Sequence, residues 1–82
     1  MKVKVLAFAR VRELLGGDRF ELDVRDGATA EDAWAHLAQR CAGLLPLAGS
    51  TRIARNGRLL SDRAEPLSDG DELALLPPVG GG

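Results

Sequence analysis

Hydrophobic and polar residues alternate in the first part of the chain, which predicts two β-strands. In residues 1–9, every second side chain falls on the same face, and the two faces differ in character. One face carries Val3, Val5 and Ala7, and the other carries Lys2, Lys4, Leu6 and Phe8. Residues 19–25 alternate in the same way, with Phe20, Leu22 and Val24 on the apolar face. We expect these strands to form an antiparallel pair.

Two segments show the three- and four-residue spacing of apolar positions that is typical of helices. The first is short, covers residues 10–15 and ends at Gly16-Gly17. The second begins after Thr29, a suitable N-cap residue, and runs to about Cys41. Its apolar stripe consists of Ala30, Ala33, Trp34, Leu37 and Cys41. Cys41 is therefore expected to be a core thiol rather than a catalytic one.

The second half of the chain predicts three short strands. These strands are expected at residues 51–55, 58–60 and 71–76. Asn56-Gly57 is a strong hairpin signal between the first two, and residues 44–50 are expected to be irregular because they contain a proline and a glycine. The order of elements is therefore β-β-α-β-β-β with one main helix. Because one helix covers only one face of a sheet, the sequence predicts an α+β domain of two layers over residues 1–76.

Composition mainly argues against certain classes of function, namely nucleic-acid binding, metal binding and membrane insertion. The 82 residues suffice for one domain, and the net charge of −1 gives no electrostatic reason to expect nucleic-acid binding. The single cysteine excludes an internal disulfide, and the lone histidine has no metal-ligating residues at useful spacing, so no metal site is expected. No apolar run approaches the roughly 20 residues of a membrane span, and no signal peptide is recognisable. We expect a cytoplasmic protein that does not associate with membranes.

The end of the chain has a distinctive composition. It reads Pro77, Pro78, Val79, Gly80, Gly81 and Gly82. The prolines end sheet pairing and favour an extended path, and the glycines leave the terminus without side chains, thin enough to enter a narrow channel in another protein. The α-carboxylate of Gly82 needs activation by a partner enzyme, because the chain contains no phosphate-binding loop of its own. A glycine-rich terminus is equally typical of a simple frayed end, so the tail residues alone leave both interpretations open.

Three segments carry a family resemblance, namely residues 5–14, 54–57 and 67–82. In order and spacing they resemble the MoaD family, the small subunits of molybdopterin synthase. The proline pair and the terminal glycines are the most specific part of this resemblance, which extends over the whole chain. Gly80 stands where alanine is usual in the family, and Leu75 and Leu76 stand where phenylalanines are common.

The resemblance implies a ubiquitin-like β-grasp fold, in which a mixed sheet packs on one main helix and a flexible glycine tail follows at residues 77–82. It also implies a sulfur carrier. An adenylyltransferase of the MoeB type, similar to ubiquitin-activating enzymes, would use ATP to adenylate Gly82, and a sulfur donor protein would convert the adenylate to a thiocarboxylate. The tail would then deliver sulfur to the active site of a MoaE-type large subunit, which forms the dithiolene of molybdopterin. In this scheme the chain binds no cofactor and is the non-catalytic subunit of the synthase.

The alternation pattern and the resemblance together predict a partner-binding surface. Four apolar residues fall on the sheet face opposite the helix, namely Leu6, Phe8, Ala74 and Leu76. An exposed apolar patch of this kind marks a contact surface, and Leu59 or Leu60 is expected to extend it. Arg12 lies in a family-like segment, where a surface ion pair and a partner contact are both compatible with it. The predicted partner-binding residues are Phe8, Arg12, Leu59, Leu60, Leu76, Pro77, Pro78, Val79, Gly80 and Gly81.

Two other functions fit the same pattern. One is a sulfur carrier for thiamine synthesis or tRNA thiolation, which shares the fold and the diglycine end. The other is a ubiquitin-like conjugation module, in which Gly82 forms an isopeptide bond with a lysine. The Pro-Pro-Val spacer and the chain length favour the molybdopterin pathway over these alternatives.

Overall fold

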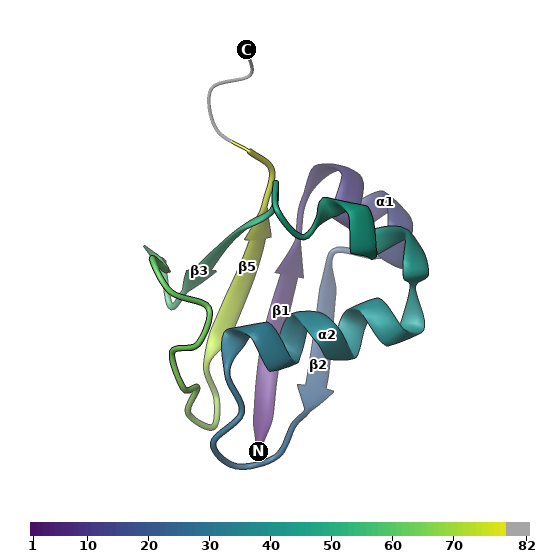
Figure 1. Ribbon diagram of the computed structural model, residues 1–82. Helices are drawn as coiled ribbons and strands as arrows, with labels where there is room; N and C mark the ends of the chain where they lie inside the picture. Colours follow the sequence, from purple (N-terminus) through teal and green to yellow (C-terminus); the bar gives the residue numbers. More distant parts are fainter. Residues whose placement is uncertain (79–82) are drawn as a thin grey trace.

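The computed structural model describes residues 1–78, and the predicted roles of residues 79–82 lie outside the described part. The elements follow the predicted order (Figure 1). They are β1 (Lys2–Ala7), α1 (Ala9–Leu15), β2 (Arg19–Asp23), α2 (Ala30–Arg40), the 3-10 helix η1 (Ala42–Leu47), β3 (Arg52–Arg55), β4 (Arg58–Leu59) and β5 (Glu72–Leu76). The predicted α+β class is confirmed.

A five-stranded mixed sheet forms one layer, and helix α2 lies across one of its faces (Figure 1). The strand order is β2-β1-β5-β3-β4. Strand β1 pairs antiparallel with β2, as predicted, and parallel with β5, while β3 pairs antiparallel with both β5 and β4. The strand that precedes the tail, β5, is therefore the middle strand of the sheet.

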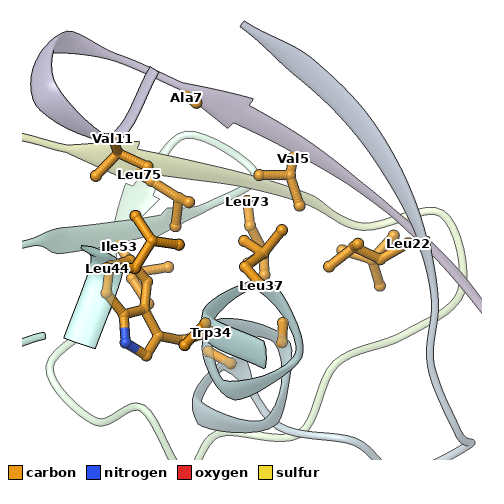
Figure 2. Close-up of a cluster of buried hydrophobic side chains, with 14 of the residues drawn as sticks. Val5, Ala7, Val11, Leu22, Trp34, Leu37, Leu44, Ile53, Leu73 and Leu75 are labelled. Carbon is orange, nitrogen blue, oxygen red and sulfur yellow. The ribbon is translucent and has the colours of Figure 1, made fainter. Parts of the chain in front are cut away.

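The core lies between the sheet and α2 (Figure 2). Its largest fully buried side chains are Leu22, Leu37, Leu44, Leu73, Leu75, Val3 and Val5. Those that come from strands occupy the alternate positions that the sequence pattern assigned to the apolar face, and Leu37 comes from the predicted stripe of α2. Cys41 was expected to be a core thiol, but it is only partly buried: it follows the last residue of α2, packs against the core, and its thiol lies 3.6 Å from the carbonyl oxygen of Leu14.

The start of α2 forms as its sequence predicts. Thr29 is the N-cap, and its hydroxyl accepts a hydrogen bond from the backbone N–H of Asp32 at 3.1 Å. The Asp32 carboxylate accepts the N–H of Thr29 in return at 2.9 Å, which completes a capping box. This hydrogen bond from the Thr29 backbone lowers the pKa of Asp32 below its ordinary value, because it stabilises the ionised carboxylate.

The prediction of an irregular segment at residues 44–50 was wrong in part, because residues 42–47 form the 3-10 helix η1. Its turns are closed by hydrogen bonds from Leu44 N–H to Cys41 C=O and from Ala48 N–H to Leu45 C=O. Leu44 is fully buried, and its burial holds this segment against the rest of the core. Local composition does not show that burial, so the proline and glycine indicated a loop.

Candidate functional site

The sheet face opposite α2 carries an exposed group of apolar side chains, which we call the apolar patch. It consists of Leu6, Phe8, Leu59, Ala74 and Leu76. Phe8 is 43% exposed and Leu59 is 45% exposed, while the other three are partly buried. Exposed aromatic and aliphatic side chains that gather on one sheet face are typical of a surface that contacts another protein.

The register of the sheet makes the apolar patch continuous. Leu6 of β1 lies opposite Ala74 of β5, Ala74 lies opposite Ala54 of β3, and Ala54 lies opposite Leu59 of β4. These four residues form a row across four strands. Ala54 was missed as part of this surface, because its place in the row depends on the pairing of β3 with β5, which local sequence does not show. Ala54 itself is only 6% exposed, so it connects the exposed members of the row and adds little exposed apolar area of its own.

Leu59 and Leu60, both predicted to bind a partner, lie on different sides of the sheet. Leu59 belongs to the apolar patch, whereas Leu60 packs against the buried core on the other side of the sheet. Arg12 is exposed on α1 and lines a cavity of about 130 Å³ together with Phe8 and Leu6. The structure therefore brings Arg12 to the apolar patch. Binding by these residues stays a prediction.

The tail begins beside the apolar patch. Because β1 and β5 run parallel, with Ala7 opposite Leu75, both strands end at the same edge of the sheet. Phe8 follows one of these strand ends, and Pro77 and Pro78 follow the other and are exposed. Any protein that covers the apolar patch is thereby placed next to the start of the tail.

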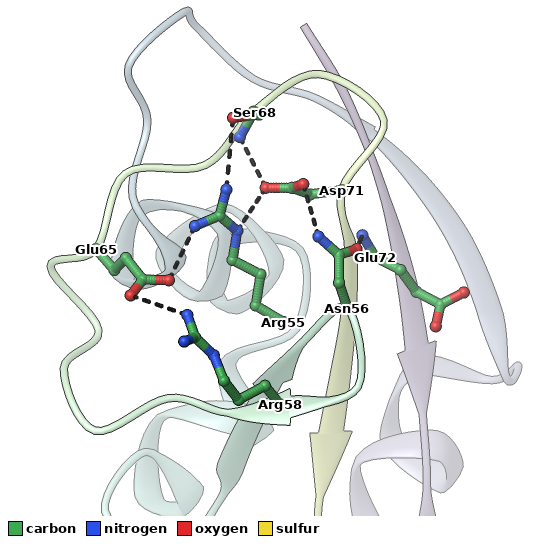
Figure 3. A network of polar contacts seen from close by, with 7 residues as sticks. All are labelled: Arg55, Asn56, Arg58, Glu65, Ser68, Asp71 and Glu72. Atoms are coloured by element: carbon green, nitrogen blue, oxygen red, sulfur yellow. Dashed lines mark hydrogen bonds and ion pairs between the residues drawn. The ribbon is translucent and has the colours of Figure 1, made fainter.

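A polar network anchors the opposite end of β5 (Figure 3). Asp71 is buried, and its carboxylate accepts hydrogen bonds from Arg55 Nε at 2.7 Å, from Asn56 Nδ2 at 2.9 Å and from the Ser68 N–H at 2.7 Å. Arg55 also donates to Glu65 at 2.9 Å. The network ties the β3 hairpin and the loop before β5 to the first residues of the tail-bearing strand.

The same contacts set the protonation of Asp71. Burial raises the pKa of this carboxyl, but hydrogen bonds from the Ser68 backbone, Asn56 and Arg55 together outweigh burial, and the pKa lies below its ordinary value. Asp71 is therefore ionised at neutral pH, as the ion pair with Arg55 requires. Its hydrogen bonds hold the loop and the start of the strand together.

The described residues contain neither a metal-ligand cluster nor a membrane-spanning helix. No group of three or more histidine, cysteine, aspartate or glutamate residues in 1–78 is arranged to hold a metal ion. Within the same range, no helix has the length and apolar composition needed to cross a membrane.

Comparison with known proteins agrees with this geometry. Residues 5–82 match the sequence profile of the ThiS family. The chain belongs to the ThiS family. It is 42% identical to the molybdopterin synthase sulfur carrier subunit of Escherichia coli over 81 residues, which cover 98% of this chain and 99% of that protein. The resemblance to the small subunits of molybdopterin synthase is confirmed.

Solved structures of several proteins share the fold. A putative molybdopterin converting factor subunit 1 from Pyrococcus furiosus matches with a TM-score of 0.87 and 33% identity, over 96% of this chain and 99% of that one. SAMP1 from Haloferax volcanii matches with a TM-score of 0.85 and 30% identity over the whole of both chains. These matches confirm the predicted β-grasp fold.

One similar structure is a complex. It is the protein–protein complex of subunits 1 and 2 of the molybdopterin-converting factor from Helicobacter pylori. The match covers 100% of both chains at 32% identity, with a TM-score of 0.70. That protein from Helicobacter pylori is therefore seen in complex with a second, different subunit.

Proposed function

We propose that this protein is the sulfur carrier subunit of a molybdopterin synthase. The observation that carries the proposal is the placement of an exposed apolar patch at the base of a tail that leaves the middle strand of a β-grasp sheet. The identity of 42% to the Escherichia coli sulfur carrier subunit, over nearly the whole of both chains, supports it. Docking through the apolar patch orients the tail toward a partner's active site.

The proposed chemistry takes place at the carboxylate of Gly82. A carboxylate is a poor electrophile, so a partner adenylyltransferase first joins it to AMP and releases pyrophosphate from ATP. Sulfide released by a donor protein then attacks the acyl carbon, AMP leaves with the electrons of the broken acyl–oxygen bond, and the terminus becomes a thiocarboxylate. The large subunit of the synthase receives this sulfur. Since a dithiolene contains two sulfur atoms, each product consumes the cargo of two carriers.

In this proposal the chain contributes binding and delivery, and its partners contribute catalysis. ATP is a substrate of the activating enzyme and is not held by the carrier. The three partners are the adenylyltransferase, the sulfur donor and the large subunit, and the Helicobacter pylori complex supports the last of these. The cytoplasm, where ATP is available and thiols stay reduced, is the proposed location.

Intact-protein mass spectrometry tests the proposed reaction. The protein is incubated with ATP, a sulfide source and the adenylyltransferase from the same organism. We expect a mass increase equal to the replacement of one oxygen by one sulfur, located by fragmentation at Gly82, and no increase when ATP is omitted. A terminus that stays a carboxylate under these conditions would contradict the proposal.

The likeness to SAMP1, the small archaeal modifier protein 1 of Haloferax volcanii, supports a second candidate function, which is conjugation to other proteins. The same spectrometer separates the two. Because Arg63 is the last site for trypsin, tryptic digestion of proteins from cells would show residues 64–82 of the chain attached to lysines if the chain were a modifier. A carrier for thiamine synthesis or tRNA thiolation would also form the thiocarboxylate, and it is distinguished by failing to support dithiolene formation with the large subunit.

A further inference from the structure

The charges on the sheet face that bears the apolar patch are unevenly distributed. On the half that is distant from the tail, positive and negative residues are neighbours. Lys4 lies between Glu21 and Glu72 in the register of the sheet. Lys2 forms ion pairs with Glu21 at 3.4 Å and Asp23 at 3.5 Å, which raise the pKa of this lysine. This half of the face has its charges compensated within the chain.

On the half nearer the tail, the residues directly opposite the cations are apolar, although Arg19 also lines a cavity together with Glu21 and Glu72, with neither of which it forms an ion pair. Arg19 of β2 lies opposite Leu6, and Arg52 of β3 lies opposite Leu76. The two arginines therefore border the apolar patch from two sides, and both are exposed. Arg12 borders it at Phe8, on a third side. We call these three residues the arginine frame.

Within residues 1–78, no carboxylate forms an ion pair with the arginine frame. Asp18 lines the same cavity as Arg12 and Arg19 without pairing with either. The chain pairs most of its other arginines: Arg10, Arg25, Arg55, Arg58 and Arg63 all contact a carboxylate. Arg40, at the end of α2, is the remaining arginine without an ion pair in the described part, and it lies where a cation suits the helix dipole.

We propose that the protein that receives the tail presents carboxylates to Arg12, Arg19 and Arg52 around an apolar centre that covers the patch. This inference rests on the proposed function and deepens it by specifying the chemistry of the partner surface. A guanidinium that is enclosed beside apolar side chains loses its hydration, and a carboxylate partner compensates that loss. A neutral or basic partner surface would leave these cations without compensation.

Protein carboxylates fit the arginine frame better than nucleic-acid phosphates do. The chain has a net charge of −1, and the three arginines are separated by leucine, alanine and phenylalanine side chains rather than arranged in a continuous basic stripe. An apolar centre with charged residues at its rim is the usual composition of a protein–protein interface. The frame therefore steers and orients the docking of a protein with an acidic rim.

Association kinetics with the large subunit from the same organism test this inference. Arg19→Gln and Arg52→Gln each remove a charge and keep a long polar side chain, and Arg40→Gln is the matched control away from the patch. At low ionic strength we expect each frame variant to associate about 3-fold more slowly than the wild type, and the double variant about 10-fold more slowly. Arg40→Gln should change the rate by less than about 1.5-fold. Thermal unfolding of every variant checks that the fold is retained.

Salt provides a second readout. The wild-type association rate should fall steeply as ionic strength rises, and the double variant should show a flatter dependence, because screening acts on the charges that it lacks. Rates that are insensitive to salt and equal in frame and control variants would overturn the inference while leaving sulfur transfer, and so the proposed function, intact. Competition for the patch by a single-stranded RNA would also overturn it. Failure of the wild type to bind the large subunit would contradict both proposals.

Discussion

At the scale of single residues, Asp71 shows how a buried carboxylate holds the strand that carries the tail. Its hydrogen bonds to Arg55, Asn56 and Ser68 join three segments that are distant in sequence. The sequence indicated only a turn at Asp69-Gly70, since Asp-Gly is a common turn pair. The ion pair between residues 55 and 71 depends on the pairing of β3 with β5, so no local pattern reveals it.

The lowered pKa values of Asp71 and Asp32 predict acid sensitivity. A carboxyl whose folded pKa lies below its unfolded value, about 3.8, contributes stability that is fully present above that value and is lost as pH falls through the folded pKa. We therefore expect the free energy of unfolding to decrease as pH falls below about 4. Urea unfolding measured at a series of pH values checks this expectation.

A variant assigns part of that acid sensitivity to Asp71. Asp71→Asn removes the charge that pairs with Arg55, so it should lower the free energy of unfolding at neutral pH by about 2 kcal/mol and make its pH dependence weaker. Asp26→Asn is the matched control, because the Asp26 side chain is 97% exposed and its ion pair with the N-terminal amine, at 3.6 Å, is screened by solvent. An unchanged pH profile in Asp71→Asn would contradict the role given to its carboxylate.

At the scale of secondary-structure elements, the spacing of apolar residues and the residues typical of turns predicted most of the fold. Alternation placed Val3, Val5 and Ala7 on the buried face of β1, and Asn56-Gly57 forms the hairpin turn with positive φ at both residues. Helix η1 was missed because its formation accompanies the burial of Leu44, which is a tertiary effect. Burial against distant elements was the information that local sequence lacked.

The capping box of α2 gives a prediction for one element. Thr29→Ala removes the hydroxyl that accepts the Asp32 N–H, so we expect the free energy of unfolding to decrease by about 1 kcal/mol. Thr29→Ser keeps the acceptor oxygen and should retain most of the stability. Chemical denaturation of both variants measures the difference. Equal losses in alanine and serine variants would show that the cap hydrogen bond contributes little.

The open face of the sheet gives a second element-scale prediction, which concerns docking. Leu59→Asp places a charge in the apolar patch and should weaken binding to the large subunit about 10-fold or more, because the charge is desolvated on docking. Leu45→Asp is a matched control, since Leu45 is 63% exposed on η1, outside the patch. Isothermal titration calorimetry measures both affinities. Similar affinities for the two folded variants would contradict a docking role for the patch.

At the scale of the whole molecule, the sheet topology connects docking to delivery. Because β5 is the middle strand, the tail starts between the last residues of β1 and the first residues of β3. It therefore begins beside the apolar patch rather than at a remote edge of the sheet. The sequence predicted the patch residues Leu6, Phe8 and Leu76 from alternation, and family resemblance supplied the role of Gly82. It predicted Arg12 as a contact residue but did not predict Ala54, Arg19 or Arg52, because strand order and register decide which side chains become neighbours.

The most direct test of the carrier function separates docking from sulfur transfer. Removing Gly81 and Gly82 leaves a terminal carboxylate on Gly80 but shortens the reach of the tail by up to about 7 Å, and it leaves the apolar patch and the core intact. Affinity for the large subunit is measured by calorimetry, and dithiolene formation is measured with the reconstituted activating enzyme and ATP. We predict a folded protein that binds the large subunit within about 3-fold of the wild-type affinity, since the patch supplies most of the contact, and that transfers no sulfur. Sulfur transfer by the truncated protein would contradict the central claim.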